Sequence, residues 1–320
     1  NAYERTAALL TTQMNHKLIA ESSDRFRYAA EDAPGKYVDL LCTPNALKGL
    51  AGRGTVHHVA FATPDAQTQL EMIEKLNIDD IKPTSRRYPA IIFEMEREAG
   101  DQILEVKDLE KTKDGELLFS NVDIKLKKGD KVAVLSKNSL AITEFFEILA
   151  GNVEADKGTV AWGVTTNQSH MPLDNTNFFQ EDLSLVDWLR QYSTEKDESF
   201  IRGFLGRMLF SGDEALKKCT VLSGGEKQRC MFSRMMLSGA NVLVFDEPTN
   251  HLDLESITAL NNGLVDFTGT MLFTCHDHQL TQTVATRMLE IGPKGFLDKL
   301  MTFDDYIADE KVKAQKEAIY

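Results

Sequence analysis

The residue types best suited to chemistry lie in two short runs in the second half of the chain. Leu222–Glu226 reads Leu-Ser-Gly-Gly-Glu before a helical pattern, and the apolar run Val242–Phe245 ends in Asp246 and Glu247. Two glycines at the start of a helix let backbone N–H groups approach an anion, and the serine hydroxyl adds a donor. At the end of a buried strand, Asp246 can hold Mg²⁺ and Glu247 can orient an attacking water. The two runs therefore predict phosphate chemistry at one edge of a sheet.

A further segment and a histidine follow the two carboxylates. Pro248–Asp253 comes directly after Glu247, and His276 follows a strand-like run, Thr270–Thr274, where an imidazole can contact a terminal phosphate. Each pattern alone has an ordinary alternative: a Gly-Gly is often a turn, an Asp-Glu often a plain strand end, and a lone histidine often a solvated loop residue. Their order along one chain favours the phosphate site.

The segments around these residues alternate between strands and helices, which predicts an α/β domain with a largely parallel sheet and an inserted helical piece. The apolar Val242–Phe245 suits a central parallel strand that is covered on both faces. The other strands expected are Gln102–Val106, Leu117–Leu126, Lys131–Leu135, Thr159–Trp162, Thr270–Thr274 and Met288–Ile291. The helices expected are Ala141–Leu149, Leu183–Tyr192, Glu198–Phe210, Glu226–Ser238 and Leu254–Asp266.

Residues 77–320 resemble the second ATP-binding cassette of an ABC-F protein, a family of soluble cassette ATPases, many of which act on the ribosome. The resemblance implies a P-loop NTPase-type ABC nucleotide-binding domain with a helical subdomain, which binds ATP and Mg²⁺. It identifies Ser223–Glu226 as the signature and Asn250–Asp253 as the D-loop. The run Ser85–Pro89 and the acidic segment after Thr302 also resemble that family.

The resemblance also assigns roles to single residues. Glu247 is implied as the catalytic glutamate and His276 as the switch histidine. The implied Mg²⁺ ligands are Thr143, Gln168 and Asp246. The implied nucleotide-binding residues are Asn138, Thr143, Gln168, Ser223, Gly224, Gly225, Glu226 and Asp253.

The phosphate loop of this family departs from its pattern here. The motif G-x-x-x-x-G-K-[ST] falls on Ser136–Thr143, where Ser136, Ser139 and Ala141 replace glycines, Ile142 replaces the lysine and Thr143 alone is kept. Losing the lysine removes a charge-assisted contact of about 1.5–3 kcal/mol, a tenfold to hundredfold loss of affinity.

Two other features bear on this loop. Lys137 is an alternative source of charge, but it lies on the wrong side of the loop for the usual geometry. The adenine-stacking aromatic expected near Lys111–Gly115 is also missing, since this stretch reads Lys-Thr-Lys-Asp-Gly. We therefore expect weak or absent nucleotide binding at the chain's own loop, which has a degenerate Walker A motif.

Family cassettes work as head-to-tail pairs, with ATP between one cassette's phosphate loop and the other's signature. The resemblance therefore implies a partner cassette, in a homodimer or a heterodimer, for the intact signature of this chain. We expect feeble ATP hydrolysis by the chain alone. One alternative is a non-catalytic interaction protein that keeps the cassette shape. The ribosome is a possible partner by resemblance, although most of the family's linker between cassettes is missing or replaced.

Residues 1–76 resemble a glyoxalase or ring-cleaving dioxygenase of the vicinal oxygen chelate superfamily. The segments that carry this resemblance are Arg25–Tyr28, Pro34–Leu41 and Gly54–Phe61. The superfamily builds metal sites from βαβββ modules, which implies a small α+β domain and His58 and Glu105 as ligands of a divalent metal, Fe or Mn. The alternative for His58 is an ordinary strand histidine. The resulting division is 1–76, a linker 77–100, a cassette 101–308 and a charged tail 309–320.

Composition limits the classes of protein that this chain can belong to. The net charge of −13, from 36 Lys and Arg against 49 Asp and Glu, argues against DNA as a partner and against binding nucleic acid over the whole surface. No apolar run reaches the ~18 residues of a membrane span, and no secretory leader is recognisable. The four cysteines are scattered. We therefore expect a cytoplasmic protein with reduced thiols and no membrane partner.

Overall fold

The computed structural model describes residues 10–11, 16–21, 25–29, 37–41 and 88–320. It divides the chain into two units, Asn1–Ser85 and Arg86–Tyr320. The first unit contains an antiparallel sheet in the order β1-β2-β3, formed by β1 (Lys17–Glu21), β2 (Arg25–Ala29) and β3 (Tyr37–Leu41). The predictions for residues 42–76, His58 among them, lie outside the described residues.

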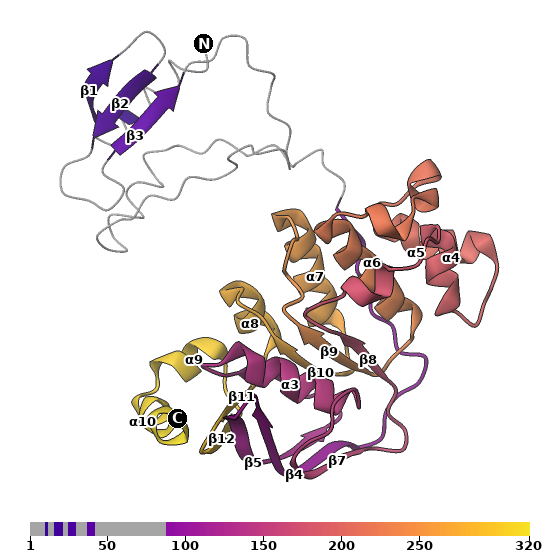
Figure 1. The fold of residues 1–320 in the computed structure, drawn as a ribbon, viewed down its shortest axis with the longest axis vertical. Helices are drawn as coiled ribbons and strands as arrows, with labels where there is room; N and C mark the ends of the chain where they lie inside the picture. Colours follow the sequence, from indigo (N-terminus) through magenta and orange to yellow (C-terminus); the bar gives the residue numbers. More distant parts are fainter. Residues whose placement is uncertain (1–9, 12–15, 22–24, 30–36, 42–87) are drawn as a thin grey trace. The chain divides into compact units, whose positions relative to one another are not determined.

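The second unit is built on a six-stranded sheet in the order β12-β11-β6-β10-β9-β8 (Figure 1). Its strands are β6 (Lys131–Leu135), β8 (Gln168–Met171), β9 (Val242–Asp246), β10 (Thr270–Thr274), β11 (Arg287–Gly292) and β12 (Gly295–Lys299). All neighbouring strands are parallel except β11 and β12. The carboxyl ends of β6, β9 and β10 therefore meet at one edge, as the sequence predicts.

Each central strand divides its side chains between two hydrophobic clusters. Val242 and Val244 join one cluster, while Leu243 and Phe245 join the other. The first cluster contains α3 (Ser139–Leu149), and the second contains residues of the helices that cover the opposite face of the sheet. Burial on both faces explains why this strand is a continuous apolar run.

A second, antiparallel sheet in the order β5-β4-β7 covers the far side of α3 (Figure 1). It consists of β4 (Gln102–Lys113), β5 (Glu116–Lys127) and β7 (Lys157–Trp162). Phe119 of β5 meets Phe145 of α3 edge to face, with ring centroids 5.9 Å apart. Helix α3 is thus packed from two sides, which fixes the loop that precedes it.

The inserted helical piece lies between β8 and β9 in the chain. It comprises α4 (Leu185–Gln191) and α5 (Glu198–Arg207), which pack on α6 (Gly224–Leu237). The remaining helices are α7 (Leu254–Asp266), α8 (His278–Val284), α9 (Phe303–Ala308) and α10 (Glu310–Ile319), and the short 3-10 helices are Thr176–Phe179, Gly212–Leu216 and Cys219–Val221.

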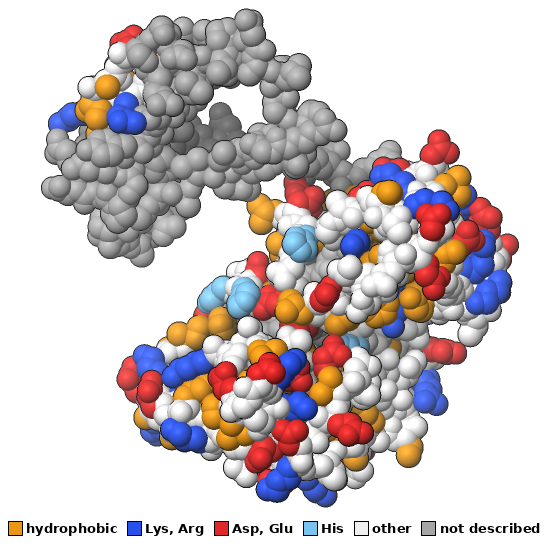
Figure 2. Space-filling view, viewed as in Figure 1, with side chains coloured by type: hydrophobic (Ala, Val, Ile, Leu, Met, Phe, Trp, Pro, Cys, Tyr) orange, Lys and Arg blue, Asp and Glu red, His pale blue; other side chains and the backbone are white. Residues whose placement is uncertain are grey.

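Two segments predicted as a linker and a tail pack against this unit. Ile91 and Phe93 are buried, and the ring of Phe93 meets Phe245 edge to face at 5.8 Å. The charged segment after residue 308 forms α10, which packs on β11 and β12. No helix in the described part of the chain is both long and apolar enough to cross a membrane. Acidic and basic side chains alternate over the visible face of the second unit (Figure 2).

Candidate nucleotide site

The end of β9 and the first turns of α3 bring a carboxylate and a hydroxyl together. Thr143 Oγ1 donates a hydrogen bond to Asp246 Oδ2 at 2.8 Å. Asp246 is only 4% exposed, and this burial raises its pKa to about 6, with the nearby Glu247 and Glu147 acting in the same direction. Carboxylate and hydroxyl oxygens are ligands that Mg²⁺ accepts, so this pair fits a Mg²⁺ site.

Glu247 is held in a defined position beside this pair. Its backbone has a φ of 52°, in the left-handed region that a glutamate rarely adopts, and its N–H donates to Thr274 O at 3.1 Å. The His276 N–H donates to Glu247 Oε2 at 3.1 Å, and His276 Nε2 lies 3.4 Å from Glu247 Oε1. The imidazole is 88% exposed. The two predicted catalytic residues are therefore in direct contact, with the histidine on the solvent side.

The strand register contradicts the prediction that Gln168 joins the Mg²⁺ and nucleotide site. In the parallel pair of β8 and β9, Gln168 lies opposite Val242. A parallel strand rises about 3.3 Å per residue, so Gln168 is roughly 13 Å from the edge that carries Asp246. Its Nε2 instead donates to Thr166 Oγ1 at 2.6 Å. The prediction was wrong because β8 was not foreseen, and the direction of that strand decides which of its ends faces the site.

The signature forms a complete cap on helix α6. Ser223 N donates to Glu226 Oε2 at 2.9 Å, and Glu226 N donates to Ser223 Oγ at 3.4 Å. Lys217 Nζ also donates to Glu226 Oε1 at 3.0 Å. Burial acts to raise the pKa of Glu226, but the hydrogen bonds from Ser223 and Lys217 prevail and hold it below its usual value. The glutamate therefore organises the helix start, while Ser223 and Gly224 are exposed.

The two signature glycines are also required by packing inside the chain. A Cβ on Gly225 would lie 2.7 Å from the backbone oxygen of His251, and one on Gly224 would lie 3.0 Å from its imidazole. His251 itself has a φ of 64°. Asp253 caps α7 by accepting a hydrogen bond from Ser256 N at 2.9 Å. The signature and the segment after β9 thus form one tightly fitted unit.

The predicted phosphate loop is short, and its backbone donors are occupied. Only Ser136–Asn138 separate β6 from α3, which begins at Ser139, two residues earlier than predicted. Asn138 N donates to Ser136 Oγ at 3.2 Å, Leu140 N donates to Asn138 Oδ1 at 3.0 Å, and Ala141 N donates to Asn138 O at 3.1 Å. Asn138 therefore acts as the helix cap and takes up donors that a phosphate would need.

The charged side chains around this loop already have partners inside the chain. Glu144 of α3 is buried and forms an ion pair with Lys113. Asn138 Nδ2 donates to Glu116 Oε1 at 3.3 Å. The alternative cation, Lys137, places its ammonium 4.3 Å from the centre of the Tyr320 ring. Ile142, in the lysine position, is buried within the cluster around α3.

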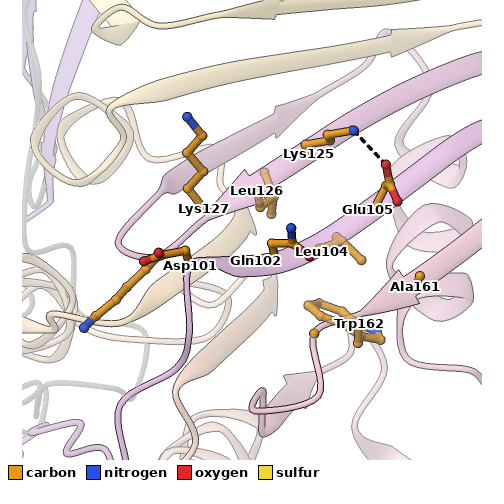
Figure 3. Close-up of a pocket in the computed structure, with 11 residues that line it drawn as sticks. Asp101, Gln102, Leu104, Glu105, Lys125, Leu126, Lys127, Ala161 and Trp162 are labelled. Atoms are coloured by element: carbon orange, nitrogen blue, oxygen red, sulfur yellow. Dashed lines mark ion pairs between the residues drawn. The ribbon is translucent and has the colours of Figure 1, made fainter.

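Glu105, the predicted metal ligand, lies elsewhere and has other partners. Its Oε1 is 2.8 Å from Lys125 Nζ and 3.1 Å from Lys107 Nζ, and hydrogen bonds from these lysines lower its pKa. Figure 3 shows Glu105 and Lys125 facing each other along a groove of about 630 Å³ on the antiparallel sheet. Within the described ranges, no group of three His, Cys, Asp or Glu side chains could hold a metal. The geometry assigns Glu105 to an ion pair, which corrects that prediction.

This geometry agrees with comparisons to known proteins. Residues 119–250 match the family model described as ABC transporter. The chain contains an ABC-type ATP-binding cassette. Two solved structures show the same fold: an inward-facing putative metal-chelate type ABC transporter (TM-score 0.53, 20% identity, 67% of this chain and 88% of that one), and the ADP conformation of MJ1267, an ATP-binding cassette of an ABC transporter (TM-score 0.52, 15% identity, 67% and 97%). The predicted α/β fold of the P-loop NTPase type is thereby confirmed.

Three relatives show where similar sequences occur. This chain is 54% identical over 263 residues to the uncharacterized ABC transporter ATP-binding protein YkpA of Bacillus subtilis, covering 82% of this chain and 49% of that protein. It is 37% identical over 255 residues to the probable ATP-binding protein YbiT of Escherichia coli O157:H7, covering 79% and 48%. It is 31% identical over 202 residues to the energy-dependent translational throttle protein EttA of Escherichia coli K12, covering 61% and 36%. The chain thus spans about half or less of the length of these relatives.

Proposed function

We propose that this ABC-F-type cassette supplies a signature half-site. In this proposal Ser223–Glu226 closes on Mg²⁺ and ATP held by a partner cassette, while the chain's own degenerate phosphate loop binds nucleotide weakly or not at all. The observation that carries the proposal is the occupation of the loop's backbone donors by Asn138, Ser136 and Tyr320.

The surface around the signature supports a partner at this place. Helix α6 has 14 residues, and its N-terminus carries partial positive charge that favours a phosphate. Val221, just before the signature, is 71% exposed, and Leu254, at the start of α7, is 55% exposed. Exposed apolar side chains beside the signature and in the segment that follows the D-loop suit an interface that closes around a charged ligand.

The chemistry of the site follows from the groups at the edge of the sheet. Thr143 and Asp246 would hold Mg²⁺, which neutralises phosphate charge when bound. Glu247, fixed by Thr274 and His276, would accept a hydrogen bond from the attacking water. The His276 ring contacts Glu247 at 3.4 Å and is otherwise exposed, so it would turn toward a terminal phosphate by giving up this one contact. These groups act on nucleotide bound at the chain's own phosphate loop. Because that loop binds nucleotide weakly, the chain without a partner should hydrolyse ATP slowly.

The partners and location stay predictions. The similarity to EttA, an energy-dependent translational throttle protein, makes the ribosome the first large partner to test. A cytoplasmic location is predicted from the resemblance to ABC-F proteins. A non-catalytic interaction protein is the second candidate, which the filled loop also favours. Nothing in the described residues favours a dioxygenase or glyoxalase-type activity.

A mixing experiment tests the proposal. The variant with Ser136→Gly, Ser139→Gly, Ala141→Gly and Ile142→Lys, here called the restored-loop variant, regains the phosphate-loop pattern. Adding Ser223→Arg to it blocks its own signature, so it can hold ATP but cannot close on a second copy's nucleotide. We expect an equimolar mixture of this protein with the wild type to hydrolyse ATP faster than either protein alone.

The control for this experiment replaces the wild type by its Ser223→Arg variant, which should remove the gain. If the restored-loop protein binds ATP but the mixture with wild type stays inactive, the signature does not act in trans between copies, and the non-catalytic candidate is favoured. The ATP affinity of each protein is measured in the same preparation by isothermal titration.

A further inference from the structure

The phosphate loop has an unexpected neighbour in the last residue of this chain. Lys137 N donates a hydrogen bond to the phenol oxygen of Tyr320 at 2.7 Å. The ammonium of the same lysine lies over the Tyr320 ring at 4.3 Å from its centre. One tyrosine therefore contacts both groups of Lys137 that could face an anion: its backbone donor and its positive charge.

The position of Tyr320 is fixed by the packing of α10. Asp309 caps this helix, and Val312 and Ile319 are buried. Lys294 N, in the turn between β11 and β12, donates to Ile319 O at 2.9 Å. The helix thus ends against a β-hairpin of the main sheet, and the tyrosine side chain is directed to the start of α3.

The phenol group is fully used in this arrangement. A tyrosine hydroxyl has one proton to donate and lone pairs to accept. The Tyr320 hydroxyl lies 3.1 Å from Glu290 Oε1 and 3.2 Å from Ile291 O as a donor, and accepts from Lys137. Burial raises the pKa of Tyr320 to about 12, and the Glu290 charge also raises it. The phenol is therefore protonated at neutral pH and can donate and accept at once.

Glu290 anchors this contact from the strand next to the loop. It is 2% exposed on β11 and pairs in register with Leu135, the last residue of β6. Its carboxylate accepts from Tyr306 at 2.6 Å and lies 3.0 Å from Lys316 Nζ. A buried carboxylate with three partners holds the Tyr320 hydroxyl in place.

We propose that Tyr320 is an intramolecular ligand of the phosphate loop, which takes the donor and the charge that a nucleotide phosphate would otherwise meet. The inference rests on the proposed function, because it explains part of the low affinity expected of this loop. Tyr320 is a positioning residue: it acts through Lys137 and not on substrate.

The test uses three variants of the full chain. Tyr320→Phe removes the hydroxyl, Tyr320→Ala removes the hydroxyl and the ring, and Tyr306→Phe removes a hydroxyl from the same Glu290 without contacting the loop. Two quantities are measured: hydrogen exchange of the Lys137 amide, and affinity for ATP without Mg²⁺ by ligand-observed NMR. The exchange rate of Lys137 relative to that of the neighbouring amides separates loss of this contact from a general loss of stability.

We expect Lys137 to exchange faster in both Tyr320 variants and to be unchanged relative to its neighbours in Tyr306→Phe. ATP affinity should rise about threefold to tenfold in Tyr320→Ala, which is the ratio of dissociation constants that one neutral hydrogen bond corresponds to. The rise should be smaller in Tyr320→Phe, because the ring still lies under the Lys137 ammonium. Unchanged exchange at Lys137, or unchanged ATP affinity in both Tyr320 variants, would overturn the inference. Tight ATP binding by the wild type would instead contradict the proposed function, so the two failures are distinguishable.

Discussion

Two helix starts in this cassette, those of α3 and α6, have the same local design and opposite surroundings. Each begins after a side-chain cap, Asn138 for α3 and Ser223 for α6. At α6 the cap partner, Glu226, lies in the same turn, and Ser223 and Gly224 are open to solvent. At α3 the preceding loop is filled by a tyrosine from the end of the chain. A helix N-terminus therefore binds an anion only where its donors are free, which secondary structure alone does not decide.

The charged side chains at the two helix starts have similar partners. Lys217 pairs with Glu226 at the start of α6. At the start of α3, Glu116 accepts a hydrogen bond from Asn138, and Lys113 pairs with Glu144. A lysine is thus paired with a glutamate at both places, so the ion pairs alone do not separate the two helix starts; the occupied backbone donors of the loop before α3 do.

The largest effect, a gain in ATP affinity, is expected when the N-terminus of α3 is opened to a phosphate as that of α6 is. The restored-loop variant should bind ATP about tenfold to hundredfold more tightly than the wild type, because its glycines reopen the start of α3 and the lysine, in place of the buried Ile142, then supplies a charge-assisted contact. Isothermal titration measures the affinity. The same variant with Met in place of the lysine at position 142 keeps the size without the charge, and equal affinities for the two would show that charge is not the missing element.

A smaller effect is expected at the carboxylate next to α3. Asp246→Asn should stabilise the protein by about 2 kcal/mol near pH 7.5, because it removes a buried charge whose pKa is raised to about 6. The folded-state pKa lies above the ordinary value of 3.8. The protonated carboxyl therefore stabilises the fold fully below about pH 4, and this contribution is lost as the pH rises through 6.

Urea unfolding at several pH values measures this difference. The stability of the wild type relative to Asp246→Asn should fall between pH 4 and pH 7. Asp213→Asn, on an exposed 3-10 helix, serves as the control and should show no such trend. A stability difference independent of pH would show that Asp246 is not the titrating group.

At the start of α6, the loss of stability caused by adding a methyl group to Gly225 tests how closely the signature packs against its neighbours. Gly225→Ala should cost about 1–3 kcal/mol, because the new Cβ would lie 2.7 Å from the His251 backbone oxygen. Gly203→Ala in α5 is the matched control: it meets open space and should stabilise by about 0.5–1 kcal/mol. Thermal unfolding of both variants gives the comparison, and equal effects would mean that α6 and the D-loop segment are not tightly fitted.

The smallest effect is expected for the cap itself. Ser223→Ala removes the hydroxyl that accepts from Glu226 N and should lower stability by about 1 kcal/mol. Ser223→Asp keeps an acceptor and should restore most of the loss. Urea unfolding separates the two, and no difference between them would show that the cap adds nothing to the helix start.

Much of the fold could be predicted because its signals are local. The bounds of β6 and β10 and of helix α7 agree with the predicted runs, since each is an apolar or amphipathic stretch between clear end signals. Strands β8 and β12 were missed because Gln168–Met171 is partly polar and Gly295–Lys299 is an edge strand with a mixed pattern. The error at Gln168 followed directly from the missed β8.

The residue types of the candidate site could be predicted from the sequence, but the contacts that fill its phosphate loop could not. Asp246, Glu247 and His276 follow two predicted strands, so their meeting could be foreseen. The early start of α3 had a local signal, since asparagine is a strong helix cap. The contact between Tyr320 and Lys137 joins residues 183 positions apart, and no local pattern encodes such a pair. The ion pairs of Glu105 depend in the same way on which strand becomes its neighbour.

Equilibrium binding of ATP with Mg²⁺ to the wild-type chain alone tests the central claim most directly. With nuclear magnetic resonance signals of residues 136–143 as the readout, the account predicts no saturable change at micromolar nucleotide. Saturable binding of one ATP per chain at micromolar concentration, with shifts at Asn138 and Thr143, would contradict it.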